Sequence, residues 1–336
     1  YPDTDYLYSD EDKIDKEGNT FDHFEKPDFS PERLRGQNYC SHLSVFRKSL
    51  LEKVGYFRPG FDGSQDYDLI LRATEKARRI FHIRKVLYHW RVVQGSTAGD
   101  IDAKTESFNH AKDAVEEHCN RVGINASVTN SDLGYVIVKR KVTKPPKVSI
   151  IIPARNEEQN IGRCLDSILD QTLPKTQVEI IVVDDGSSDK TASIVRTYFE
   201  KNVRLLQLSD DAGGKKAALT KGIETACHPL IVTTDADCIY PNNWLNTLLS
   251  YRAEQDAVFV AAPVKYAKEN SFFERFQSLD FLSLQGITAA AVSKQLFNMC
   301  NGANLLYSKE AFQKVKGFEG IDHIPTGDDM LLMEKM

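Results

Sequence analysis

Two aspartates that follow a short apolar run have the spacing of a metal site. Residues 229–244 read PLIVTTDADCIYPNNW, so Asp235 and Asp237 come directly after the apolar run 230–232. Such a run predicts a buried strand of a parallel sheet, and ligands bind outside the carboxyl ends of these strands. Carboxylates suit Mg²⁺ or Mn²⁺, and Mg²⁺ is usually held together with substrate phosphates. We therefore expect a phosphate-bearing substrate; the alternative is a solvated turn in which one aspartate caps the next helix.

The elements that would position this pair alternate regularly from residue 147 onward. Strand-like and helix-like segments follow one another with the lengths of β-α-β units, which predicts an α/β fold with a doubly wound, mostly parallel sheet. The expected strands are 148–152, 179–183, 203–206 and 230–232, and the expected helices are 158–170, 189–200, 215–226 and 242–251.

Composition narrows the classes of protein. A chain of 336 residues suggests about two domains, and a hydrophobic share of 41% can fill their cores. A net charge of −5 gives no basic surface, which excludes nucleic acid as the main partner. No apolar run approaches the ~20 residues of a membrane-spanning helix. The six cysteines lack metal-site spacing, and we expect them to be reduced in a cytoplasmic protein.

The chain contains an internal repeat. FRKSLLEKVGYF at 46–57 aligns with YSKEAFQKVKGF at 307–318, an offset of 261 residues, and Asp66 then falls opposite Asp329. Further upstream, DYLYS at 5–9 aligns with DAVFV at 256–260, an offset of 251. Residues 1–142 therefore read as the back half of a unit, with a helical linker, and the prolines of TKPPK at 143–147 mark the boundary to a second domain at 147–336.

Two further segments are ambiguous. Residues 10–29 are polar and predict a loop after a strand at 6–9, so the D-x-D of Asp10 and Asp12, which aligns with 261–263, reads as a solvated acidic loop rather than a metal site. Residues 272–299 form a helix with a broad apolar face. Ordinary core packing is the default for that face, and the alternatives are a cover over the acceptor side or contact with a membrane surface.

Six motifs in order resemble those of inverting family 2 glycosyltransferases with the A-type, Rossmann-like fold. They are PARNEE at 153–158, VDDGSSD at 183–189, GGKKAAL at 213–219, DAD at 235–237, NGANLLY at 301–307 and GDD at 327–329. Residues 1–142, through YSDEDKID, GSQDYDL, YHWR and GSTA, resemble the back half of tandem-domain transferases of rhamnan and O-antigen assembly. Residues 147–336 resemble a membrane-anchored, polysaccharide-synthase-like transferase, but without the C-terminal part of such a transferase.

The resemblance implies a metal-assisted single displacement from a nucleoside-diphosphate sugar, UDP-linked by preference, to a glycan or lipid-linked acceptor at the inner face of a cell membrane. Asp237 would bind Mn²⁺ or Mg²⁺, and Asp235 would bind the metal or the ribose. Asp329, beside Asp328, would be the catalytic base, with Asp66 its counterpart in the first unit; the plain reading of Asp328 is a cap on helix 329–335.

The nucleotide would be bound by residues of four motifs. Asp185 or Asp184 would accept from the base, Pro153, Ala154 and Glu157 would line the base and ribose, and Lys215 or Lys216 would reach the diphosphate. A turn in GSSD and a surface lysine are the plain readings. The alternative function is a non-catalytic scaffold or assembly module of a cell-surface polysaccharide system, which would follow if the half unit and the missing synthase segment had left no active site.

Overall fold

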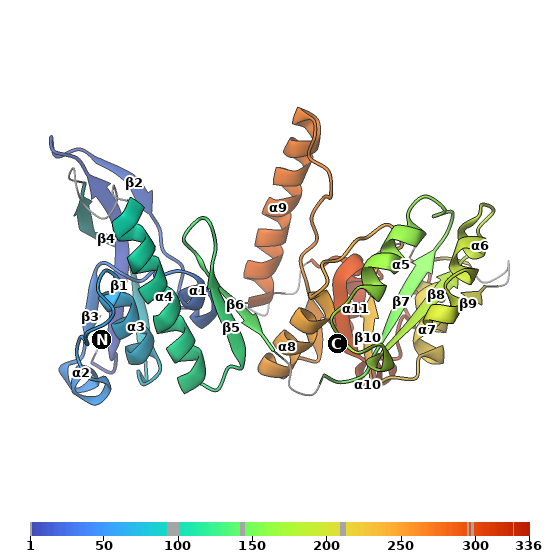
Figure 1. Cartoon of the computed structure of the whole chain (residues 1–336), viewed down its shortest axis with the longest axis horizontal. Coiled ribbons are helices and arrows are strands. Elements are labelled where there is room, and N and C mark those ends of the chain that lie inside the picture. Colours follow the sequence, from blue (N-terminus) through green and yellow to red (C-terminus); the bar gives the residue numbers. More distant parts are fainter. Residues whose placement is uncertain are drawn as a thin grey trace. The chain divides into compact units, whose positions relative to one another are not determined.

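The chain divides into two compact units, residues 1–141 and 142–336, drawn in Figure 1. The structure, a computed structural model, describes residues 2–92, 101–141, 145–208, 213–293, 296, 299–324 and 326–336.

The second unit is built on a six-stranded sheet in the order β11-β12-β10-β7-β8-β9. Strands β7 to β10 are parallel to one another, whereas β12 runs antiparallel to both of its neighbours. The strands are β7 (Val148–Ala154), β8 (Val178–Asp184), β9 (Val203–Gln207), β10 (Leu230–Thr233), β11 (Phe259–Ala261) and β12 (Leu305–Ser308). A mostly parallel sheet of an α/β unit is therefore confirmed.

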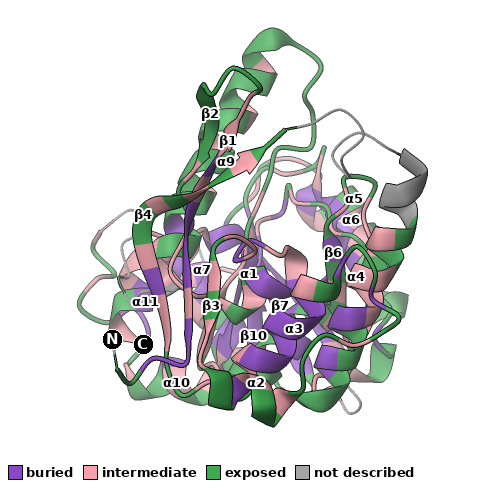
Figure 2. Cartoon of the chain, turned by 90° about the vertical axis from the view of Figure 1, so that its left-hand side faces the viewer, coloured by how far each residue is buried: buried purple, intermediate pink, exposed green. Residues whose placement is uncertain are grey.

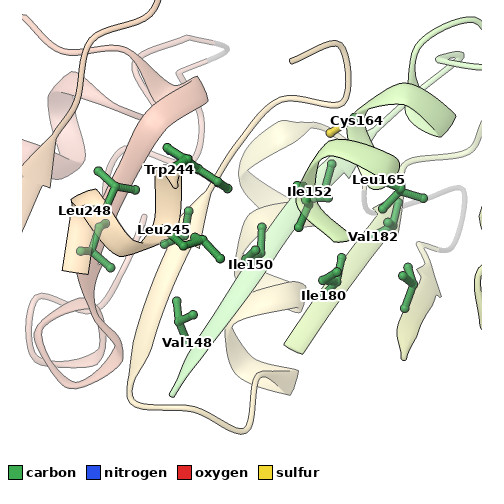
Figure 3. Close-up of a cluster of buried hydrophobic side chains, with 14 of the residues drawn as sticks. Val148, Ile150, Ile152, Cys164, Leu165, Ile180, Val182, Trp244, Leu245 and Leu248 are labelled. Atoms are coloured by element: carbon green, nitrogen blue, oxygen red, sulfur yellow. The ribbon is translucent and has the colours of Figure 1, made fainter. Parts of the chain in front are cut away.

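Helices cover both faces of this sheet because its central strands are apolar on both sides. Val148, Ile150 and Ile152 of β7 point into one core, with α5, α6 and α8 (Figure 3). Ile151 points into the other core, with α7, α10 and α11. The helices are α5 (Ile161–Leu169), α6 (Thr191–Arg196), α7 (Lys215–Thr225), α8 (Trp244–Gln255), α9 (Phe272–Ser293), α10 (Lys309–Lys314) and α11 (Met330–Lys335), with 3-10 turns η1 (Lys175–Gln177), η2 (Phe199–Lys201) and η3 (Gly302–Asn304).

The close approach of α7 to the sheet depends on one glycine. A Cβ on Gly222 would lie 2.4 Å from Cγ2 of Ile151, so only glycine lets the helix pack at this distance. The predicted β-α-β run is thus present, with element ends that differ from the expected bounds by a few residues, as at β7, which continues through Pro153 to Ala154.

The first unit has its own four-stranded sheet, in which β1 pairs with β2, β3 and β4, and a separate two-stranded sheet. Its strands are β1 (Tyr6–Ile14), β2 (Thr20–Phe24), β3 (Ser44–Phe46), β4 (Ile80–Arg91), β5 (Ala126–Asn130) and β6 (Val136–Arg140). Its helices are α1 (Pro31–Gly36), α2 (Lys48–Val54), α3 (Gln65–Thr74) and α4 (Ile101–Arg121). Helix α3 is mostly buried at the centre of this unit (Figure 2).

The loop expected at residues 10–29 is wrong, because β1 continues to Ile14 and forms a hairpin with β2. Asp10 and Asp12 are only 5% and 8% exposed, so the solvated acidic loop is wrong as well. Their burial is possible because partners satisfy them: Asp10 accepts from Nε2 of His82 at 2.7 Å, and Asp12 contacts His89. Buried carboxylates are tolerated when they are paired in this way.

The repeat extends to the three-dimensional register. Tyr6 pairs with Phe46 across β1 and β3 and stacks on it at 4.7 Å, while Phe259 pairs with Tyr307 across β11 and β12 and stacks on it at 5.7 Å. These matched pairs place Tyr6 opposite Phe259, an offset of 253 residues rather than the expected 251. The correction of two residues keeps every side chain on its face of the strand, since the period of a strand is two.

Candidate functional site

A cleft of about 410 Å³ opens at the carboxyl ends of the parallel strands of the second unit. Each of β7, β8 and β10 ends in it or just before it, as expected for ligand binding in an open α/β sheet. The residues that line it are Pro153, Ala154, Arg155, Glu157, Asp185, Lys215, Asp235, Ala236 and Asp237. The structure therefore brings together seven of the residues selected from the sequence and adds Arg155 and Ala236.

Asp235 and Asp237 stand on the cleft wall immediately after β10. The side chain of Asp235 is 36% exposed, and Asp237 is exposed. Within the described ranges, no three His, Cys, Asp or Glu side chains lie together as a complete protein-only metal site. Two accessible carboxylates fit a Mg²⁺ or Mn²⁺ ion that takes its remaining ligands from substrate phosphates and water, which is the usual form of a magnesium site.

Lys215 joins this wall to the acidic pair near the end of the chain. Its Nζ lies 2.7 Å from Oδ1 of Asp235 and 3.2 Å from Oδ2 of Asp328. Burial disfavours the charged amine, but Asp235 and Asp328 outweigh that effect and raise the pKa of Lys215 above its ordinary value. The lysine is therefore a stable ammonium at the point where the metal-side and base-side carboxylates meet.

Asp329 is held in place by backbone groups. Its Oδ1 accepts from the N–H of Met330 at 2.7 Å, and its Oδ2 accepts from the N–H of Gly302 at 3.0 Å. Asp329 rather than Asp328 is thus the N-cap of α11, which begins at Met330. The prediction that Asp328 caps the helix is therefore wrong. The side chain of Asp328 is 15% exposed and contacts Lys215 instead.

The two aspartates at the end of β8 have different surroundings. Asp184 is buried, and its oxygens accept from the N–H of Ser187 at 3.2 Å and from Nε2 of Gln207 at 3.1 Å. Asp185 lines the cleft, and both of its oxygens accept from the N–H of Gly214, at 3.0 and 2.9 Å. Successive strand residues point to opposite sides, so only one of the pair faces the ligand space.

The two lysines of the GGKK motif are also separated. Lys216 is 8% exposed, and its Nζ donates to the backbone oxygens of Ile321, Ile324 and Thr326 at 2.6, 2.8 and 2.9 Å. Its ammonium is therefore used to hold the segment that precedes α11. Of the two lysines considered for the diphosphate, only Lys215 therefore has an ammonium available in the cleft.

The cleft also contains a cation that the sequence leaves undecided. Arg155 is well exposed, and its guanidinium lies 3.5 Å from Oδ2 of Asp185. The sequence alone cannot show whether an arginine in a polar loop faces a ligand site or only solvent. The structure shows that Arg155 belongs to the cleft, because it follows β7 opposite the end of β8.

In the first unit, Asp66 has local contacts like those of Asp329. Its Oδ1 accepts from the N–H of the next residue, Tyr67, at 2.8 Å, and its Oδ2 accepts from Nδ2 of Asn38 at 2.9 Å. Both aspartates thus accept from the N–H of the next residue, but Asp66 lies within the first turn of α3, whose N-cap is Ser64, whereas Asp329 is the N-cap of α11.

Helix α9 differs from the expected core packing. Of its described side chains, Thr288 alone is buried, while apolar residues along it are largely exposed: Phe272 87%, Phe273 66%, Phe276 59%, Leu279 63%, Leu282 63% and Ile287 55%. Core packing, expected for residues 272–299, is therefore wrong for the helix that the structure describes; residues 294, 295, 297 and 298 lie outside the described residues. No helix in the described part of the chain is long and apolar enough to cross a membrane.

Comparison with known proteins agrees with these motifs. The sequence model of the family described as Glycosyl transferase family 2 matches residues 149–316. The chain is 34% identical over 281 residues to the uncharacterized protein y4gI of Sinorhizobium fredii, covering 79% of this chain and 30% of that protein. It is 32% identical over 256 residues to the O-antigen biosynthesis protein RfbC of Myxococcus xanthus, covering 74% of this chain and 20% of that protein.

Among solved structures, a mannosyltransferase from Pyrobaculum calidifontis, in complex with GDP-Man and Mn²⁺, is similar at a TM-score of 0.43 and 23% identity, covering 64% of this chain and 57% of the other. The family match spans the sheet and cleft from β7 to α10. The chain therefore belongs to glycosyl transferase family 2. It spans less than a third of the length of y4gI and of RfbC.

Proposed function

We propose that the second unit transfers a sugar, with inversion, from a nucleoside-diphosphate donor to a glycan or lipid-linked acceptor. The observation that carries this proposal is the cleft that gathers Asp185, Lys215, Asp235 and Asp237, with the acidic pair joined to it through Lys215. UDP is the nucleotide we expect first, because Asp185 is suited to accept from the imide N–H of uracil.

On the donor side, each wall of the cleft has a role. Pro153, Ala154 and Glu157 would line the base and ribose, and Lys215 would pair with the diphosphate. Asp235 and Asp237 would hold Mg²⁺ or Mn²⁺, which neutralises the charge that develops on the departing diphosphate. Asp184 would support the site indirectly, since its hydrogen bonds hold the turn that follows β8.

On the acceptor side, we assign the general base to Asp329. The acceptor hydroxyl would give its proton to this carboxylate while its oxygen bonds to C1 of the sugar, and the bond from C1 to the phosphate oxygen would break with its electron pair on the nucleoside diphosphate. The two backbone donors, Gly302 and Met330, orient the carboxylate and leave lone pairs for the proton.

Calorimetric titration of the full chain with UDP, in the presence and absence of Mn²⁺, tests the site. We expect metal-dependent UDP binding that is lost in Asp237→Ala and retained in Asp170→Ala, which removes an exposed carboxylate at the far end of α5. Absence of binding to UDP, GDP and TDP with either metal would refute the proposal.

The exposed face of α9 supports a membrane-surface location for the acceptor side. Aromatic and aliphatic side chains on an accessible helix partition into the headgroup region, where a lipid-linked acceptor would be found. We expect the chain to co-float with vesicles of anionic lipid, and Phe272→Ser with Phe276→Ser and Leu279→Ser to abolish co-flotation. Equal flotation of both forms would exclude this use of α9 and leave the donor site unaffected.

We further propose that residues 1–142 are a partial copy of the same fold and that residues 147–336 form the catalytic domain. The matched aromatic pairs support this assignment, as do the matched hydrogen bonds that Asp66 and Asp329 each accept from the N–H of the next residue. Limited proteolysis should cut near residues 143–146 and release residues 147–336 as a folded piece; a first cut inside the β7 to β10 region would count against the boundary.

A further inference from the structure

The position of Lys215 joins two parts of the site that are far apart in the sequence. Asp235 follows β10, whereas Asp328 lies just before the cap of α11, and the same ammonium contacts both, at 2.7 and 3.2 Å. The carboxylate expected to bind a metal is therefore paired with a cation of the protein itself.

The backbone on which Lys215 stands is fixed. Lys215 is the first residue of α7 and follows Gly214, whose φ of +112° is rarely adopted by residues with a side chain. The N–H of Gly214 donates to both oxygens of Asp185, so the start of α7 is tied to the floor of the cleft. Movement of the ammonium must therefore come from the flexible lysine side chain.

Gly302 makes space for the ion pair from the other side. A Cβ at this position would lie 3.1 Å from Oδ2 of Asp328 and 3.3 Å from Nζ of Lys215. Gly302 is also the residue whose N–H holds Asp329. The same stretch of backbone thus accommodates the lysine and orients the proposed base.

These contacts place two cations in competition. A divalent cation bound to Asp235 would lie beside the ammonium, and at such short range like charges repel strongly. A diphosphate changes the balance, because its oxygens form charge-assisted hydrogen bonds with an ammonium. Lys215 would then have an alternative anionic partner, and Asp235 would be free to bind the metal.

We propose that Lys215 is a built-in counter-ion that blocks metal binding at Asp235 until a nucleoside diphosphate draws the ammonium away. The inference rests on the proposed donor site and adds an order of ligand binding. The metal binds tightly together with the nucleotide and only weakly before the nucleotide is bound. Lys215 has two successive roles: it is the partner of Asp235 and Asp328 before the nucleotide binds, and the partner of the diphosphate afterwards.

The test is a titration of the nucleotide-free full chain with Mn²⁺, followed through the electron paramagnetic resonance signal of the free ion. Lys215→Met should bind Mn²⁺ at least about tenfold more tightly than the wild type, because the competing charge is gone. At saturating Mn²⁺, the same variant should bind UDP about tenfold more weakly, because the diphosphate has lost its ammonium. The two effects have opposite signs, which simple damage to the site would not produce.

Lys221→Met is the matched control, because it removes an exposed lysine from the same helix and should leave both affinities unchanged. Lys215→Arg keeps the charge and should bind nucleotide-free Mn²⁺ as weakly as the wild type does. If Lys215→Met does not fold, Lys215→Gln gives the same readout.

Mn²⁺ affinity that is unchanged or reduced in Lys215→Met, in a chain whose wild type binds UDP with Mn²⁺, would overturn this inference and leave the proposed function intact. A wild type that binds no nucleotide with Mn²⁺ would overturn both. The two failures are therefore distinguishable in one set of titrations.

Discussion

The same strand-and-helix segment occurs in both units, and its carboxylates are used differently. In the first unit, Asp68 of α3 is 1% exposed and accepts hydrogen bonds from Arg58 and Arg72. These two arginines neutralise its charge within the fold. In the second unit, Asp328 and Asp329 lie at the start of α11 and meet Lys215 and backbone N–H groups instead. Asp66, the counterpart of Asp329, likewise contacts no arginine in the described chain, so the second unit differs in another way: its Asp328 contacts Lys215, which lines the donor cleft.

The largest expected difference is in activity. Asp329→Asn should slow donor-sugar hydrolysis or transfer by about 10²- to 10⁴-fold, because the proposed base is lost. Asp66→Asn should change the rate by less than about twofold, although it makes the equivalent change in the first unit. Asparagine keeps one acceptor oxygen at each position, so both variants should remain folded. Hydrolysis of a panel of nucleotide sugars, resolved by product mass, gives the rates; equal losses in the two variants would abolish the distinction.

The next difference is in stability. Asp68→Asn should lower the free energy of unfolding of the first unit by about 3 kcal/mol, because the largely buried charge of Arg72 loses its carboxylate partner. Asp328→Asn should cost the second unit less than about 1 kcal/mol, since the partly exposed Lys215 keeps Asp235 as its partner. The chain has 2 tryptophans, Trp90 in the first unit and Trp244 in the second, so denaturation of Trp90→Phe and Trp244→Phe backgrounds reports each unit separately.

A smaller effect separates the two adjacent lysines. Lys216→Met should destabilise the second unit by about 2 kcal/mol, because three backbone oxygens lose a charged donor, and should leave the affinity for UDP unchanged. Lys215→Met should do the reverse, with little change in stability and a clear change in ligand binding. Thermal unfolding and UDP titration of the same two samples would show the contrast, and a loss of UDP affinity in folded Lys216→Met would contradict it.

The smallest expected difference is in the response to acid. Burial opposes ionisation of Asp68 and of Glu75, but hydrogen bonds from Arg58 and Arg72 to the first, and from His118 and Arg121 to the second, hold both pKa values below their ordinary range. Groups with a lowered folded-state pKa stabilise the fold above their unfolded-state pKa of about 4, and this stability is lost as the pH falls through the folded-state value.

The first unit should therefore lose stability below about pH 4, since, among the residues that the structure describes, it contains more such carboxylates than the second. Lys215 has the opposite sign: its contribution is complete at low pH and is lost only as the pH rises through its raised pKa. Fluorescence of Trp90 should change before that of Trp244 during acid titration, and the reverse order would show that other groups dominate.

The parts of this architecture that local pattern controls were predictable from the sequence. Strands β7, β8 and β10 are apolar on both sides, a pattern that predicts buried strands rather than loops or exposed helices. The positions of Asp185, Asp235 and Asp237 follow from where these strands end. The acidic hairpin β1–β2 was not predictable in this way. Its buried aspartates depend on His82 and His89, which are more than 70 residues away along the chain.

The remaining differences concern neighbouring residues that a sequence reads as equivalent. Asp184 and Asp185, Lys215 and Lys216, and Asp328 and Asp329 are each adjacent and of one type. Their roles diverge because adjacent positions point about 100° apart on a helix and to opposite sides of a strand. The end of an element therefore has to be known to within one residue before the right member of each pair can be chosen.

The link between β11 and β12 begins and ends at one backbone hydrogen bond. The N–H of Ala262 donates to the carbonyl of Asn304 at 2.9 Å. This hydrogen bond joins the two ends of the segment that contains α9, where that segment leaves β11 and returns to β12. The equivalent bond in the first unit, from Ser9 to Leu43 at 3.2 Å, closes a quite different insert of a hairpin and a short helix. We expect that replacing the segment between Ala262 and Asn304 would exchange the part of the chain that we propose to face the acceptor, and would leave the carboxylates of the donor cleft in place.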